Sequence, residues 1–448
     1  MNNKKKEAVV NIVHAVDSEG PLYESLDATF SRLKELFDIE LEPSKEHLRK
    51  IQNQEINLDG KEELIAQVFS KSKLNYNDTW DKLDVMLNRI MSSDFRNKML
   101  DSFGRGWIFN WHCIDHLDYV ANPRRRDMGI HNVFDHYVQM IRDTKSYQDA
   151  LHFHFHSMTT YKEAHRCSTS FVNSPHLYEI LCRRIIDRKW FPKVYRAGFQ
   201  TERPDSNWFL EQWMPFDISS MSIDNIELLE QQADLQRGRF GDWRLAPTTW
   251  EVYQPSHDNY QLKGHCRRYI GRALNMGTRI ANIDQKEVNK AFERASNGLP
   301  TLLGITNHDF REIGADVDGF RNMLAEAKSK YHNVPFKFCE CVEGFRNVIY
   351  GEDHDFGKLE LDVRLEKNDN NMILFVDTKH GQIFGPQPFL AIKTRSNRYI
   401  HDNFDFDLSL KSWTYTFDQD SVYSNDIAAI GVATNDRYAN AFVKVINF

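Results

Sequence analysis

The chain has 448 residues, 41% hydrophobic and 27% charged, with a net charge of −7 and 6 cysteines. This balance predicts a folded protein of two or three domains and excludes a largely disordered chain. The negative charge argues against a nucleic-acid partner, and no apolar run is long enough for a membrane span. Because the cysteines lack zinc-site spacing and no export signal follows the basic start, we expect a cytoplasmic protein with free thiols. The oligomeric state stays open.

The first β-rich segment, residues 8–16, ends in Asp17-Ser-Glu-Gly-Pro. Asp17 and Glu19 are two residues apart at a strand end, so both carboxylates can face one side and act as metal ligand and general base. The same residues are also good turn formers. An amphipathic helix is expected over 26–37, followed by a helical insertion at about 38–103.

The next expected strand, 106–116, is rich in aromatic residues and ends in polar groups. Trp111 is a candidate sugar-stacking surface, although core packing is an alternative for such residues, and Asp115 is a candidate substrate contact. The loop Asn122-Pro-Arg-Arg-Arg-Asp127 contains three cations, of which Arg125 is a candidate to hold a substrate phosphate or carboxylate. A solvated loop is the alternative.

Three histidines alternate with large apolar residues in Leu-His-Phe-His-Phe-His-Ser, residues 151–157. In a strand the three imidazoles share a face, which favours a metal or catalytic site over a solvent-facing edge strand. His152 and His156 are the candidate ligand pair. His154 lies between them as a ligand, a supporting partner or a substrate contact.

Further candidates follow along the chain. A helix at 176–189 precedes a strand at 193–198 that carries Arg196, which can orient a carboxylate base. Asp217 is a possible substrate contact or only a helix cap. A long helix is expected over 261–275, and the strand 302–309 delivers His308, either a catalytic acid or a core residue bonded to Asp309.

Strands and helices alternate up to about residue 350, and polar groups recur where strands end. This pattern predicts an α/β barrel with its site at the carboxyl ends of the strands. Beyond it, in 351–448, at least six short strands separated by Asn-, Asp- and Gly-rich turns predict a β-sandwich domain.

The order of these motifs resembles the polysaccharide deacetylase (NodB-like) family, close to uncharacterised members found with surface-polysaccharide biosynthesis. The resemblance is carried by four motifs within residues 8–350: Asp-x-Glu-Gly-Pro, His-x-x-x-His, Tyr-Arg-Ala-Gly with a downstream Asp-x-Ser-Ser, and Asn-His-Asp. It implies a distorted (β/α)7 barrel and a divalent metal, with zinc expected, that removes acetyl groups from an N-acetylated sugar or glycan precursor.

By position in these motifs, the resemblance implies roles for six residues. Asp17 matches the general base, Arg196 the group that orients it and His308 the acid that protonates the leaving amine. The implied metal ligands are Glu19, His152 and His156.

The chain departs from the family pattern at three points. Ser18 separates the two acidic residues, so the roles of Asp17 and Glu19 could be exchanged. The third histidine leaves the ligand pair open to a choice involving His154, and Ala-Gly stands where Arg-x-Pro is common. Two alternative functions stay open. One is a glycan-binding or scaffold protein that has lost catalysis, and the other is a metal hydrolase that cleaves another amide or glycosidic bond.

Overall fold

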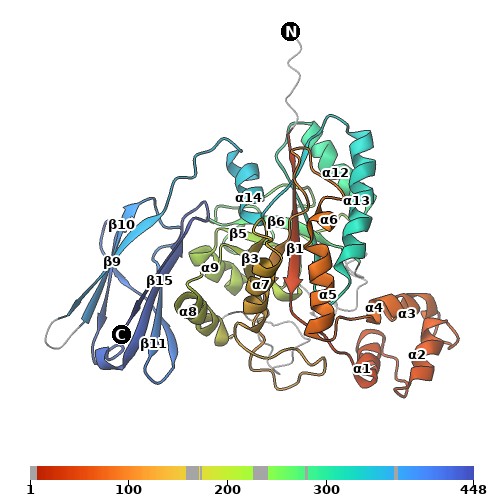
Figure 1. The fold of residues 1–448 in the computed structure, drawn as a ribbon, viewed down its shortest axis with the longest axis horizontal. Coiled ribbons are helices and arrows are strands. Elements are labelled where there is room, and N and C mark those ends of the chain that lie inside the picture. Colours follow the sequence, from red (N-terminus) through yellow and green to blue (C-terminus); the bar gives the residue numbers. More distant parts are fainter. Residues whose placement is uncertain (1–7, 158–170, 172–173, 226–240, 278–280, 368–371) are drawn as a thin grey trace, which may run out of the picture.

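In the computed structural model, seven parallel strands close into a barrel (Figure 1). The structure describes residues 8–157, 171, 174–225, 241–277, 281–367 and 372–448. β1 closes the barrel because it pairs with β7 on one side and β2 on the other. The strands are β1 (Val10–Ser18), β2 (Asn110–Cys113), β3 (Ala150–Phe155), β4 (Val194–Ala197), β5 (Phe216–Ser220), β6 (Tyr269–Asn275) and β7 (Thr301–His308), with β8 (Phe336–Phe338) added beside the start of β1.

The barrel has an apolar end and a polar end. At the N-terminal end of the strands, α14 (Cys341–Tyr350) places Phe345 against Phe216 with ring centroids 4.8 Å apart, in a cluster that includes Val13 and Leu302. Histidines and charged side chains follow towards the carboxyl ends. The outer shell contains α7 (Asn132–Asp143), α8 (His176–Arg188), α9 (Pro204–Trp213), α12 (Gln285–Ser296) and α13 (Ile313–Lys330).

The helical insertion lies between β1 and β2 and has two parts. α1 (Leu26–Phe37), α2 (Lys45–Gln52), α3 (Glu62–Val68) and α4 (Lys71–Leu74) form a small bundle around a core of their own, beyond the carboxyl end of β1 (Figure 1). α5 (Trp80–Ile90) and α6 (Ser93–Arg96) instead contribute apolar residues to the main core. The insertion therefore adds both a separate bundle and part of the barrel shell.

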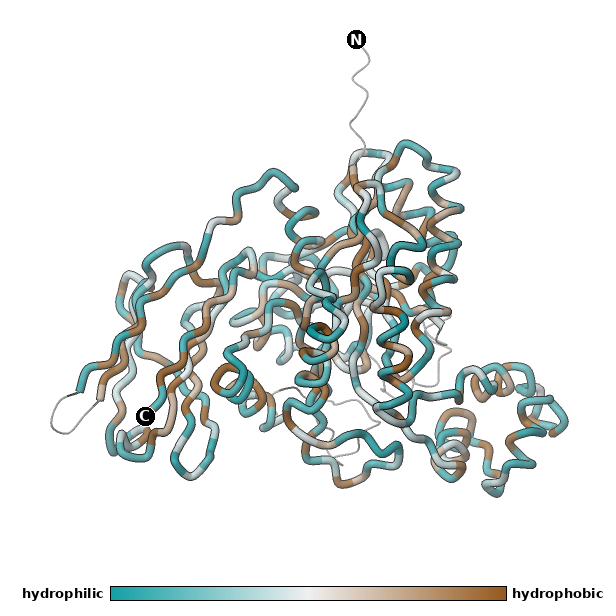
Figure 2. The backbone as a smooth tube through the Cα atoms, in the orientation of Figure 1, coloured by the Kyte–Doolittle hydropathy of each residue, from teal (hydrophilic) through white to brown (hydrophobic). Residues whose placement is uncertain are grey.

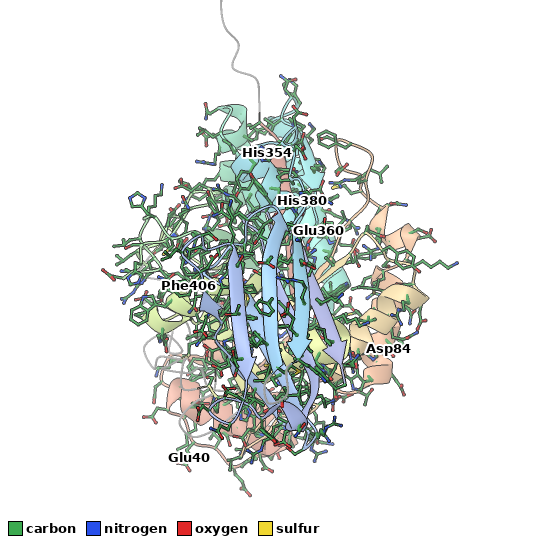
Figure 3. The ribbon with its side chains drawn as sticks, turned by 90° about the vertical axis from the view of Figure 1, so that its left-hand side faces the viewer. Glu40, Asp84, His354, Glu360, His380 and Phe406 are labelled. Carbon is green, nitrogen blue, oxygen red and sulfur yellow. The ribbon has the colours of Figure 1, made fainter. Side chains whose placement is uncertain are left out.

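The C-terminal region forms two four-stranded antiparallel sheets with an apolar core between them. One sheet contains β9 (Glu360–Lys367), β10 (Met372–His380), β13 (Asp405–Phe406) and β14 (Ser412–Phe417), and the other β11 (Phe389–Thr394), β12 (Tyr399–Asp402), β15 (Ile427–Asn435) and β16 (Ala441–Asn447). Figure 3 looks onto the first sheet, with Glu360 and His380 at one end. The second sheet packs against α8 through Phe389 and Ala433.

Hydrophobic segments follow the strands of both regions, while much of the peripheral chain is hydrophilic (Figure 2). Within the described residues, no helix has the length and apolar character needed to cross a membrane. The expected α/β barrel and C-terminal β region are confirmed at this level.

The prediction of a helix over 261–275 was wrong, because residues 269–275 are strand β6. Arg268 precedes this strand and Arg272 lies within it. Both guanidinium groups are buried outside the barrel, in ion pairs with the carboxylates of Glu202 and Asp217 for Arg268 and of Glu287 for Arg272.

Candidate metal centre

Asp17 is the last inward-facing residue of β1 and is 1% exposed. The Nε–H of Arg196, on β4, donates to Asp17 Oδ1. Burial would raise the pKa of Asp17, but the charge of Arg196 and the nearby His154 and His308 hold it below its ordinary value. Its second oxygen, Oδ2, is buried and has no hydrogen-bond partner among the described residues. Asp17 is therefore an ionised carboxylate with one oxygen held and one oxygen available.

Glu19, in the turn after β1, meets two histidines. Glu19 Oε1 lies 3.8 Å from His154 Nε2 and 3.5 Å from His156 Nε2, and the two imidazole nitrogens are 3.1 Å apart. The three ligand atoms lie within 4.8 Å of one another. His154 Nδ1 donates to the carbonyl oxygen of Arg196 at 2.9 Å, which leaves its Nε2 as an acceptor facing the group. These contacts define a candidate metal centre formed by Glu19, His154 and His156.

The donor set fits a divalent transition metal. One carboxylate and two neutral imidazoles are ligands that zinc binds, and three protein ligands leave positions for water and substrate. Burial would raise the pKa of Glu19, but Arg126 and the two histidines hold it well below its ordinary value. Burial lowers the pKa of His156, so this imidazole is neutral at pH 7. Glu19 and His156 are therefore in the protonation state that metal binding requires.

Other side chains fix Glu19 from three sides. Arg126 Nη2 lies 2.5 Å from Glu19 Oε2, which directs the other oxygen towards the histidines. His116 donates to the carbonyl oxygen of Glu19 at 3.0 Å, and the Asp309 carboxylate accepts the Glu19 N–H at 3.0 Å. Arg126, His116 and Asp309 were not predicted as residues of the site, although Arg126 and Asp309 adjoin the predicted Arg125 and His308.

His308, at the end of β7, lies beside both carboxylates. Its Nε2 is 3.6 Å from Asp17 Oδ2 and 3.8 Å from Glu19 Oε1, and its side chain is 22% exposed. Burial lowers the pKa of His308 to about 4, against the attraction of the two carboxylates. The imidazole is therefore neutral and accessible, and it does not bond to Asp309.

His152, which was expected in the ligand set, does not lie in this group. Its Nε2 is 3.1 Å from Glu340 Oε1 and 3.2 Å from Asn110 Oδ1, deeper in the barrel and next to His112. Residues four apart on a strand are separated by about 13 Å, too far to bind one ion. His154 and His156 are only two residues apart and share a face of the chain where β3 ends, so both imidazoles reach Glu19.

Gly198 leaves room for the His156 ring beside His154. A Cβ atom at this position would lie 2.0 Å from Cδ2 of the His156 ring. The Ala-Gly sequence after Arg196, one of the departures from the family pattern, therefore provides the space in which His156 lies beside His154.

Three of the predicted substrate contacts, Asp115, Arg125 and Asp217, lie away from the centre. Asp115 binds Arg184 through both oxygens, at 3.0 and 2.9 Å. The Arg125 guanidinium lies over the Tyr23 ring at 4.3 Å. Asp217 lies on the outer face of β5, paired with Arg268 at 2.5 Å.

Trp111 is also placed outside the centre. It is fully buried between the barrel and its helices, where it stacks on Phe109, and its Nε1–H donates to Asp149 at 3.1 Å. Trp107 and Trp250 are likewise fully buried. These tryptophans pack the core and offer no surface for a sugar.

Comparison of the chain with protein-family models, with curated proteins and with solved structures gave no match.

Proposed function

We propose that the protein is a metal-dependent hydrolase of the NodB-like type that removes an N- or O-acetyl group from a carbohydrate. The observation that supports this most is the position of Asp17, an ionised carboxylate held by Arg196 beside the Glu19, His154 and His156 group. A general base next to a metal-ligand set is what hydrolysis of an amide or ester needs.

A bound divalent ion, zinc in this proposal, supplies a Lewis acid for the acyl carbonyl and lowers the pKa of water. Arg196 keeps Asp17 ionised and oriented, so that Asp17 can accept a proton from the attacking water. The free Oδ2 lies 3.6 Å from His308 Nε2, so the same proton can pass to His308 and then to the departing nitrogen or oxygen. Because His308 is neutral at rest, this transfer also explains how it becomes an acid.

The test is acetate release from acetylated carbohydrates by the zinc-reconstituted protein, with metal content measured on the same sample. We expect about one ion per chain, and the Asp17→Asn variant should retain the ion and lose acetate release by about 10²–10⁴-fold. A protein that binds no divalent ion would overturn the proposal. A protein that binds metal and glycan without releasing any product would be the non-catalytic alternative. Release of a different product would identify another bond as the target.

A further inference from the structure

The α1–α4 bundle contains a groove of about 660 Å³ with cationic walls. Lys45 and Arg49 on α2 and Lys71 on α4 line it, and all three are exposed. Leu48 and Leu74 form its apolar part. The groove is thus a concave surface that presents positive charge above a small hydrophobic floor.

Two of these cations are uncompensated. Within the part of the chain that the structure describes, Lys45 and Lys71 form no ion pair, whereas Arg49 pairs with Glu55 at 2.8 Å. The residues that line the groove include three cations and no carboxylate, although the whole chain carries a net charge of −7. Such a surface attracts an anion through charge complementarity.

The groove is connected to the candidate metal centre through packed side chains. Leu74 contacts the cluster of Leu22, Tyr76 and Phe310. The ring centroid of Phe310 is 4.8 Å from that of His308, and the Asn77 N–H donates to the Phe310 carbonyl at 2.9 Å. Figure 1 shows the bundle beyond the carboxyl end of β1, which is the end of the barrel where the centre lies.

We propose that this groove binds an anionic segment of a glycan, such as consecutive uronic acid residues. The inference extends the proposed function and relies on it only for the carbohydrate nature of the ligand. An open groove with two leucines suits a hydrated polymer, because a lipid chain would need an enclosed apolar cavity. Lys45 and Lys71 would contact carboxylates, while Leu48 and Leu74 would contact sugar C–H faces.

The experiment measures binding of a uronic acid hexamer to the full-length protein by calorimetry, with and without zinc. The double variant Lys45→Glu/Lys71→Glu should weaken binding at least about tenfold, as expected for loss of two charge-assisted contacts. The matched control, Lys286→Glu/Lys330→Glu, makes the same charge change on the exposed faces of α12 and α13 and should change the Kd less than twofold.

The outcomes separate this inference from the proposed function. Binding of the acidic hexamer without zinc, but not of a neutral N-acetylglucosamine hexamer, supports the groove even if no acetate is released. Equal weakening by the control variant would show only a net-charge effect and would overturn the inference. Tighter binding of anionic lipid vesicles or inorganic phosphate than of the hexamer would also overturn it, as would failure of the unsubstituted protein to bind the hexamer at low salt.

Discussion

The buried carboxylate of Asp309 accepts a hydrogen bond from the backbone N–H of Glu19 at 3.0 Å. It also accepts from the Gly20 N–H and the Tyr137 hydroxyl, both at 2.9 Å. Burial raises the pKa of Asp309 to about 7, although these three donors favour the charged form. Asp309, the residue after β7, thus fixes the turn after β1. The position of the proposed ligand Glu19 therefore depends on a side chain outside the proposed ligand set.

We therefore expect Asp309→Asn to weaken zinc binding. The amide can accept only one of the two backbone N–H groups and presents its own donor to the other, which costs about 1–3 kcal/mol. Zinc affinity, measured by competition with a chelating dye, should fall at least about tenfold. Tyr137→Phe is the control, because it leaves both backbone bonds in place. An unchanged affinity in Asp309→Asn would show that the turn is held by other contacts.

The ligand assignment predicts different results for neighbouring histidines. His154→Ala and His156→Ala should each reduce zinc affinity at least about 100-fold, since each removes a ligand from a set of three. His152→Ala should retain zinc and lower the free energy of unfolding by about 1–3 kcal/mol, because it removes a buried imidazole that contacts Glu340 and Asn110. Loss of zinc in His152→Ala with retention in His154→Ala would contradict the assignment.

The barrel could be predicted largely because β1, β3 and β7 are apolar strands that end in polar residues. β5 and β6 were missed for one physical reason. β5 contains Asp217 and β6 contains Arg272, and both charges are buried in ion pairs outside the barrel, so the two strands have a polar, surface-like pattern in the sequence. A sequence does not show which charged residues will be buried together.

The motifs that form the site could be predicted from the sequence, but the arrangement of their side chains could not. The strand period correctly placed His152 and His154 on the inner face, but choosing between them required knowing that Glu19 lies beside His154 and that Glu340 lies beside His152. Arg126 and Arg125 are adjacent in a loop, and only the fold shows that Arg126 contacts Glu19 while Arg125 lies on Tyr23.

The close approach of Gly198 to His156 gives a prediction that does not remove any ligand. Gly198→Ala would place a methyl group 2.0 Å from the His156 ring, so the ring must move and zinc affinity should fall about tenfold or more. Gly319→Ala, in α13, has open space around its Cβ and should leave zinc affinity unchanged. Equal affinities in the two variants would show that His156 tolerates the displacement or does not bind the ion.

His308 should affect turnover without affecting metal content. Its Nε2 lies 3.6 Å from Asp17, the proposed base, and His308 is not among the three proposed ligands. His308→Ala should keep about one zinc per chain and reduce kcat for acetate release by about 10²–10⁴-fold, the usual contribution of a general acid. KM should change little. Loss of zinc in this variant would instead assign His308 to the ligand set.

The interface between α8 and the C-terminal sheet should make stability pH-dependent. His401 lies between Tyr178 and Phe389, and burial lowers its pKa to about 4 although its Nδ1–H donates to the Leu390 carbonyl. Below pH 6.5 the unfolded chain binds a proton at this residue and the folded chain does not, so stability present above pH 6.5 is lost as the pH falls towards 4. Between pH 7.5 and 5 this residue should account for up to about 2 kcal/mol of lost unfolding free energy.

Urea unfolding at these two pH values checks the prediction. His401→Phe should retain the packing and show a smaller loss than the unsubstituted protein on acidification. His257→Gln, at a side chain that is 71% exposed, should show the same loss as the unsubstituted protein. The prediction is wrong if the unfolding free energies of His401→Phe and His257→Gln depend on pH in the same way. The proton uptake would then occur at other histidines, and His401 would be charged or solvated in the folded interface.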